Sequence, residues 1–204
     1  MMGGSGAAVA TIRPGAVRAI FDHLAVSLTA DGRPGPLRFV FSHYRFRWSD
    51  DGTAGDLVFV QTPGDGGGER WLVTDQPALA DRWSRRLAPG AWSPAEAAQT
   101  PIRGSVEVSP VFDGTARERL SAGGRTIEVE LGDLAPPVLA SGPAPRLPGA
   151  DILSVLIEAG SVRASVDGRP IVDRPFMNDA WVEWLGRPLS SAVLALGEIL
   201  IGSD

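Results

Sequence analysis

The sequence predicts a mainly β protein, folded as an antiparallel barrel or a strongly curved β-sandwich with one or two short helices. Short runs in which apolar and polar residues alternate recur along the chain between turn-forming residues. Glycine and proline are abundant, with 25 and 17 residues of 204, which favours many turns over long helices. No repeat with a period of about 20–50 residues is present. The regular spacing of strands argues against alternating βαβ units.

The first third of the chain is expected to form strands. Residues 16–29 leave two assignments open: we favour a strand over 23–29, and a short helix before it is the alternative. The segments 36–48, 56–62 and 70–75 follow as strands joined by short polar loops, which predicts an antiparallel meander. The middle segment, "DLVFVQT", has consecutive apolar residues, as is typical of a strand buried on both faces.

One helix is predicted over residues 77–87. Pro77 lies in its first turn, and apolar residues recur at every fourth position from Leu79 to Leu87. Residues 88–101 are expected to form a connection.

Strands resume in the second half of the chain. The segment 102–108 alternates, and Gly123-Gly124 and Asp167-Gly168 each predict a hairpin turn. Residues 181–185, "WVEWL", are assigned to another strand. For 188–201, apolar residues at helical spacing predict a short helix, and strand alternation fits almost as well.

The chain is expected to consist of a flexible leader over residues 1–14 and a single β-rich domain over 15–204. The formal charge of −5 and the lack of a basic block argue against nucleic acid as a partner. No window approaches the ~18–20 apolar residues of a membrane span, so no membrane partner is predicted. We therefore expect a cytoplasmic protein.

The composition excludes several chemistries. There is no Cys, and all 19 basic residues are Arg, so neither a thiolate nucleophile nor a Schiff-base lysine is available. The chain has only two His residues, which makes a histidine-rich metal centre improbable. We therefore predict neither a metal nor another cofactor. Proton transfer is the chemistry that remains.

The strand in "PLRFVFSHYRFRWSDDG" poses the main question about the site. Its apolar residues stand at odd positions up to Phe41 and at even positions from Tyr44. A bulge near Ser42-His43 would direct both aromatic sets to the core, and we favour this interpretation because rings as large as that of Trp48 are rarely exposed without purpose. The alternative is an unbroken register, in which one face turns from apolar to basic and needs carboxylates or an anionic ligand opposite.

This strand and the Trp-rich segment near the C-terminus supply the candidate site residues. Histidine is the usual acid or base at neutral pH, arginine anchors anions, and paired tryptophans can line an apolar pocket. The predicted catalytic residues are His43 as acid or base, with Tyr44 or His23 as its proton partner. The predicted substrate-binding residues are Arg45, Arg47, Trp48, Trp181, Trp184 and Asp179.

These residues favour a β-barrel that binds a small molecule. As an enzyme it would be a cofactor-independent acid/base catalyst of the isomerase, cyclase or hydratase/dehydratase type, acting on a small hydrophobic or anionic substrate. The alternative is a non-catalytic β-sandwich module for protein or carbohydrate binding, or for assembly of a homo-oligomer through the C-terminal segment, residues 188–201.

Overall fold

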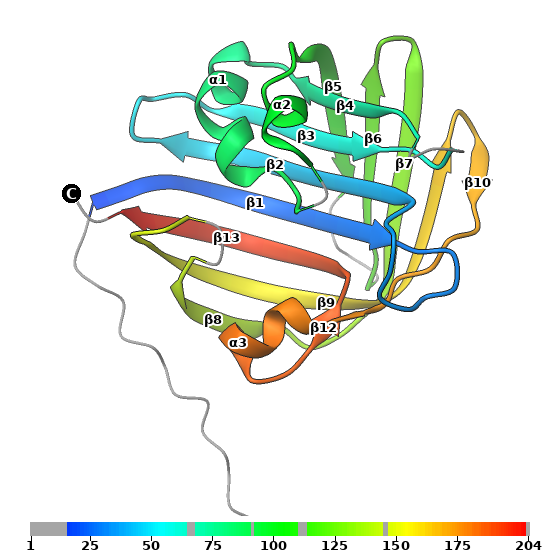
Figure 1. The fold of residues 1–204 in the computed structure, drawn as a ribbon. Helices are drawn as coiled ribbons and strands as arrows, with labels where there is room; N and C mark the ends of the chain where they lie inside the picture. The colour runs from blue at the N-terminus through cyan, green and yellow to red at the C-terminus, as the bar shows by residue number, and fades with distance from the viewer. Residues whose placement is uncertain (1–15, 65–67, 91, 110–113, 145–146, 203–204) are drawn as a thin grey trace, which may run out of the picture.

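The computed structural model describes residues 16–64, 68–90, 92–109, 114–144 and 147–202, and the predicted leader over residues 1–14 lies outside them. The strands are β1 (Ala16–Leu28), β2 (Phe39–Ser49), β3 (Gly55–Gln61), β4 (Arg70–Thr74), β5 (Ile102–Ser109), β6 (Ala116–Ala122), β7 (Arg125–Leu134), β8 (Val138–Pro143), β9 (Ala150–Val166), β10 (Arg169–Ile171), β11 (Met177–Asn178), β12 (Leu189–Ser190) and β13 (Ala192–Gly202). The helical elements are α1 (Pro77–Leu87), α2 (Pro94–Ala97), η1 (Asp179–Trp181) and α3 (Val182–Leu185). The protein is mainly β, as its sequence predicts, and the predicted helix over 77–87 coincides with α1 (Figure 1).

Eleven of the described strands form one large curved sheet whose path returns to its starting strand, and β11 and β12 pair with each other separately. Strands β1 to β4 pair antiparallel in chain order, which confirms the predicted meander. On the other edge of β1 lies β13, followed by β9. Strand β9 is 17 residues long: its first half pairs with β13 and its second half with β7. Because β7 is reached from β4 through β5 and β6, the path of neighbouring strands closes.

One pair departs from the predicted antiparallel order. Strands β4 and β5 run parallel, with Val73 opposite Ile102. A parallel pair needs a crossover connection, which α1 and α2 supply here. Helix α1 packs on β3 and β4 with its apolar face, which includes Leu79 and Trp83.

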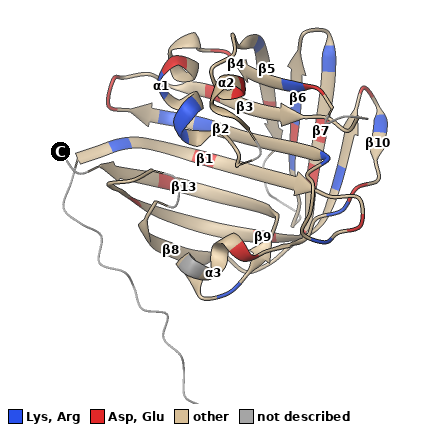
Figure 2. Ribbon diagram, in the orientation of Figure 1, with Lys and Arg blue, Asp and Glu red and all other residues tan. Residues whose placement is uncertain are grey.

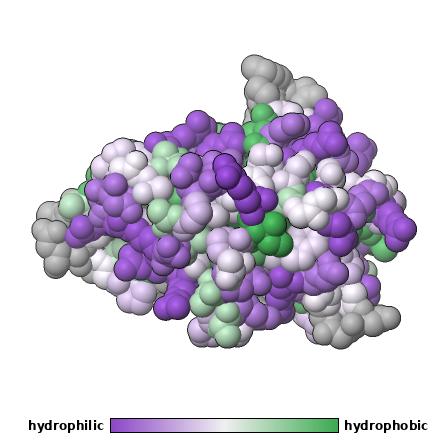
Figure 3. Space-filling model, turned by 90° about the horizontal axis from the view of Figure 1, so that it is seen from above, coloured by the Kyte–Doolittle hydropathy of each residue, from purple (hydrophilic) through white to green (hydrophobic). Residues whose placement is uncertain are grey.

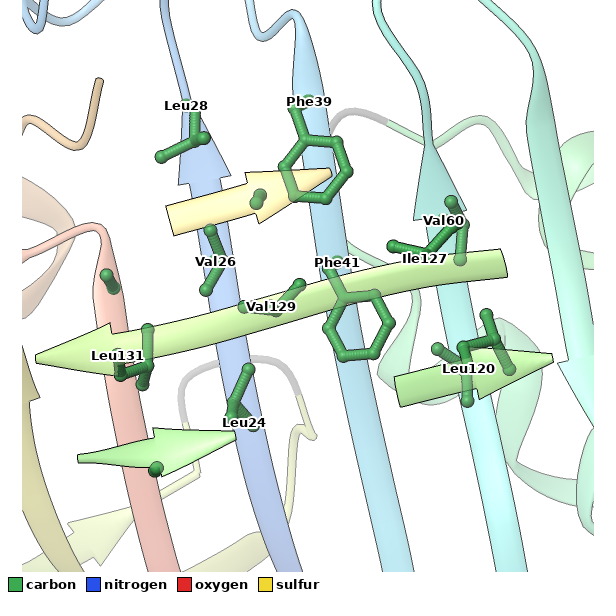
Figure 4. Packing of buried hydrophobic residues seen from close by; sticks show 14 of the residues in the cluster. Leu24, Val26, Leu28, Phe39, Phe41, Val60, Leu120, Ile127, Val129 and Leu131 are labelled. Carbon is green, nitrogen blue, oxygen red and sulfur yellow. The ribbon is translucent and has the colours of Figure 1, made fainter. Parts of the chain in front are cut away.

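The main hydrophobic core lies between two layers of this closed sheet. Strand β7 passes across β1 and β2, so that Val129 lies close to Val26 and Phe41, while Leu120 of β6 lies on the other side of Phe41 (Figure 4). The strands β1 to β3 thus have an inner face toward β6 and β7 and an outer face toward the helices. On β3, Val58 packs on the inner side and Phe59 on the outer side, which confirms that this strand is buried on both faces.

Both segments with open assignments are strands. Strand β1 runs from Ala16 to Leu28, so residues 16–22 form a strand and not the alternative short helix. Residues 188–201 lie largely in β12 and β13. Their apolar residues have helical spacing because β13 contains a bulge at Gly197, which moves the alternation from one face of the strand to the other.

The prediction of a strand over 181–185 is wrong. Trp181 ends η1 and the following residues form α3. In this helical conformation the rings of Trp181 and Trp184 stack, with 5.7 Å between their centroids. A strand would place residues three apart on opposite faces, whereas a helical turn places them on the same side.

The C-terminal strand is paired on both edges within the chain. Strand β13 pairs with β1 on one edge and with β9 on the other. It therefore offers no free strand edge to a second copy, and the predicted assembly through residues 188–201 stays a prediction.

Strands β6 and β7 form the second layer of the sheet, and the side of this layer that faces solvent is polar. Strands β6 and β7 carry alternating charges that pair across the strands, as between Arg117 and Glu130 (Figure 2). Seen from above, the molecular surface is mostly hydrophilic, with small separate hydrophobic groups (Figure 3). Among the described residues no helix has the length and apolar character needed to cross a membrane.

Candidate functional site

A cavity of about 200 Å³ lies on the outer face of the central sheet. Strands β1, β2 and β13 form its floor, and its walls come from the end of α1, from the region around Leu147 and from η1 and α3. Much of its lining is apolar, including Phe21, Ile152 and Val193. Together with a few polar side chains, this composition is typical of a small-molecule site.

His23 contacts Tyr44, Ser42 and Glu198 in this cavity. In the β1–β2 register His23 lies opposite Tyr44, and the two rings stack with 3.9 Å between centroids and 11° between planes. The Nε2 atom of His23 lies 3.0 Å from the Ser42 hydroxyl oxygen. Its Nδ1 atom lies 3.6 Å from a carboxyl oxygen of Glu198. These contacts leave the ring one defined orientation, with its second nitrogen toward Glu198.

The bulge in β13 places Glu198 on the cavity side. Before the bulge, Leu194 packs in the inner core; after it, Leu200 packs in the outer cluster, so the alternation has changed face. Gly197 has φ +58°, a left-handed conformation that glycine adopts without steric cost. Its N–H donates to Asp22 Oδ1 across 2.9 Å. This hydrogen bond to the Asp22 side chain of the neighbouring strand β1 holds the bulge in place.

The carboxyl group of Glu198 retains its proton at neutral pH. Burial raises the pKa of Glu198 from 4.5 to about 8; the negative charge of Asp22 acts in the same direction, and the Ser154 hydroxyl opposes the shift only in part. A protonated carboxyl group beside a histidine can donate a proton at one atom while the imidazole receives one at another. Acid/base sites typically contain two titratable groups whose environments push their pKa values apart, so that one group can donate a proton and the other can accept one.

The other histidine lies on the opposite face of the sheet. The β2–β3 register is unbroken from Val40 to Phe46, so His43 and Arg45 continue the inner face. The predicted bulge near Ser42-His43 is therefore wrong: the irregularity lies further along, where β1 pairs with Phe46 and then with Trp48. One face does turn from apolar to basic.

Carboxylates neutralise this basic end. His43 Nδ1 lies 2.7 Å from Glu118 and its Nε2 lies 3.0 Å from Asp56, which also binds Arg45 at 3.0 Å. Burial disfavours the imidazolium, but the charge of Glu118 and hydrogen bonds to both carboxylates outweigh it and raise the pKa of His43 to about 9. With both nitrogens protonated and bonded, His43 has no free site for a proton. His43 thus holds an ion cluster together, and its role as acid or base stays a prediction.

The remaining predicted arginines also lie away from the cavity. Arg47 binds Asp22 at 2.7 Å on the inner side. Trp48 is 41% exposed and does not line the cavity. Asp179 begins η1 next to the lining residue Asn178 and is itself outside the lining.

The predicted residues that meet at the cavity are His23, Tyr44, Trp181 and Trp184. Sequence reasoning missed Glu198, although it is the one charged residue in an otherwise uncharged stretch from 188 to 203. It also missed Ser42, whose outward direction depends on the unbroken register of β2. Among the described residues no cluster of three or more His, Cys, Asp or Glu side chains could hold a metal ion.

Comparisons with known proteins give only distant likenesses. No family model matches the chain, and no curated protein does. Among solved structures, an acetoacetate decarboxylase from Legionella pneumophila is similar at a TM-score of 0.43 and 10% identity, over 95% of this chain and 88% of that one. A second acetoacetate decarboxylase structure is similar at a TM-score of 0.40 and 11% identity, over 93% of this chain and 88% of that one. Both scores are too low to carry a functional argument.

Proposed function

We propose that this protein is a cofactor-independent acid/base enzyme that transforms a small hydrophobic substrate in the cavity on the outer face of the sheet. The observation that supports this most is the buried carboxyl group of Glu198 facing His23 at 3.6 Å. The reaction belongs to the isomerase, cyclase or hydratase/dehydratase type, because each needs a proton delivered and a proton removed, without a covalent intermediate on the protein.

The roles follow from the contacts. We assign to His23 the tautomer in which Nε2–H donates to the Ser42 hydroxyl, which leaves Nδ1, on the Glu198 side of the ring, as the nitrogen that accepts a proton. Glu198 supplies a proton to a substrate oxygen or carbon, and His23 accepts one from the substrate. Tyr44 supports the imidazole by stacking, since its hydroxyl already donates to the Leu87 carbonyl oxygen at 3.2 Å.

Solvent exchange tests the proposal without knowledge of the natural substrate. The protein is incubated in D₂O with a panel of small ketones, and the exchange of protons next to the carbonyl group is followed by NMR. We expect the wild-type protein to accelerate exchange of at least one ketone, and Glu198→Gln and His23→Gln each to reduce that rate by about 100-fold or more.

Glu128→Gln is the matched control, because Glu128 is exposed on the solvent side of β7. It should exchange at the wild-type rate. Acceleration that survives in both site variants would refute the assignment of Glu198 and His23. Binding of ketones without any acceleration would instead favour the alternative of a non-catalytic binding protein.

A further inference from the structure

The cavity on the outer face offers no guanidinium or ammonium group of the described residues to an anionic ligand. None of the described residues that line it is an Arg, and the chain contains no Lys. The arginines that the sequence suggested as anion anchors, Arg45 and Arg47, lie on the inner face and are bound to Asp56 and Asp22. A carboxylate or phosphate in the cavity would therefore be desolvated beside the acidic Glu198, with only the imidazole of His23 among the described lining residues able to carry a positive charge, which is costly.

Two hydrogen-bond donors belong to residues that line the same cavity. The carboxyl group of Glu198 holds its proton at neutral pH, as argued above. Trp184 lines the cavity, and its indole N–H is buried without a hydrogen-bond partner among the described residues. A buried donor without an acceptor costs about 1–3 kcal/mol, so a ligand that supplies an acceptor gains by pairing it.

The walls select an apolar, flat ligand. Trp181 and Trp184 stack on one side, and Phe21 and Tyr44 meet edge to face across 5.6 Å on the floor. Aromatic faces of this kind pack well against rings and planar groups. An ammonium ion would also suit aromatic rings and a carboxylate, but it has no acceptor to offer and would leave the Trp184 N–H unpaired.

We propose that the cavity binds an uncharged, mainly hydrophobic carbonyl compound whose oxygen accepts hydrogen bonds from Glu198 and Trp184. This inference rests on the proposed function, since it identifies the substrate class of the same site. It also revises the sequence-based expectation, which left hydrophobic and anionic substrates as alternatives.

Calorimetric titration with three probes that share one ring tests the inference. Acetophenone carries a neutral carbonyl group, benzoate a negative charge and benzylamine a positive charge. At pH 7 we expect acetophenone to bind at least about tenfold more tightly than benzoate or benzylamine. Tighter binding of either charged probe, or no binding of acetophenone at millimolar concentration, would overturn the proposal.

Two variants test the donors. Trp184→Phe keeps an aromatic ring and removes the N–H, and it should weaken acetophenone binding about three- to tenfold. The matched control is Trp71→Phe, since Trp71 stacks with Arg125 outside the cavity and should bind acetophenone as the wild-type protein does. Acetophenone binding should also weaken above pH 8 in the wild-type protein, where Glu198 loses its proton, but not in Glu198→Gln.

The two proposals fail in different ways. If benzoate is preferred while Glu198→Gln and His23→Gln still abolish proton exchange, the substrate class is wrong and the acid/base site stands. If acetophenone binds as expected while neither variant changes exchange, the ligand class stands and the proposed catalysis does not.

Discussion

Replacing Glu198 with Gln should stabilise the protein near neutral pH while it removes proton transfer. In the folded protein the pKa of Glu198 is about 8, against an ordinary value of 4.5. Between these values the unfolded chain has released this proton and the folded chain has not, so the free energy of unfolding falls by about 1.4 kcal/mol per pH unit. Over the whole interval between the two pKa values the loss is on the order of 5 kcal/mol.

One pH window isolates this group. The pKa of His43 rises from 6.5 to about 9 on folding, so its stabilising contribution is complete below pH 6.5 and is lost as the pH rises through 9. Between about pH 5 and 6.5 Glu198 is therefore the main source of pH dependence. The wild-type protein should lose about 2 kcal/mol across that window, and Glu198→Gln should lose little.

Urea unfolding followed by tryptophan fluorescence at several pH values in this window measures the effect. Glu128→Gln serves as the control and should follow the wild-type slope, because Glu128 is exposed. Parallel stability curves for the wild-type protein and Glu198→Gln would refute the reasoning. They would mean that Glu198 ionises at an ordinary pH and lacks the proton that the proposed mechanism requires.

Three further changes test the surroundings of this carboxyl group. His43→Gln should cost about 3–5 kcal/mol in urea unfolding at pH 7, because it leaves buried carboxylates without their cation; a loss below about 1 kcal/mol would contradict the ion cluster. Asp22→Asn retains an acceptor for the Gly197 N–H but removes the negative charge that raises the pKa of Glu198. The pH at which acetophenone binding weakens should therefore be lower in this variant than in the wild-type protein. An unchanged midpoint would contradict the influence of Asp22 on Glu198. Gly197→Ala should cost about 1–2 kcal/mol in thermal or urea unfolding, because φ is +58° while its added Cβ meets nothing within 4 Å; wild-type stability would show that the bulge tolerates a side chain.

Local patterns were sufficient for much of the fold. The alternation in β2 and β4, the continuous apolar run of β3 and the proline-led α1 are short-range features, and each has the predicted structure. The prediction failed at "WVEWL", residues 181–185, because the five residues carry no signal that separates a strand from one helical turn. It remained open for residues 188–201, because a bulge imitates helical spacing.

The site was predictable only in part for the same reason. A hairpin-like connection between their segments made a contact of His23 with His43 and Tyr44 plausible, and in the structure Tyr44 lies opposite His23 while His43 lies on the other face. The role of His43 could not be found locally, because Glu118 lies 75 residues away in sequence. Glu198 was overlooked because its direction depends on the Gly197 bulge.

The sequence by itself determined the class of fold and closed off most chemistry: without Cys or Lys, and with two His, proton transfer was the reaction type left. Only the tertiary structure decided which histidine faces a cavity and which carboxyl group is its partner. The physical reason is that one extra residue in a strand reverses the face of every side chain beyond it, and that burial by distant segments sets whether a carboxyl group keeps its proton. Both effects arise from pairing and packing between segments that are far apart in the chain.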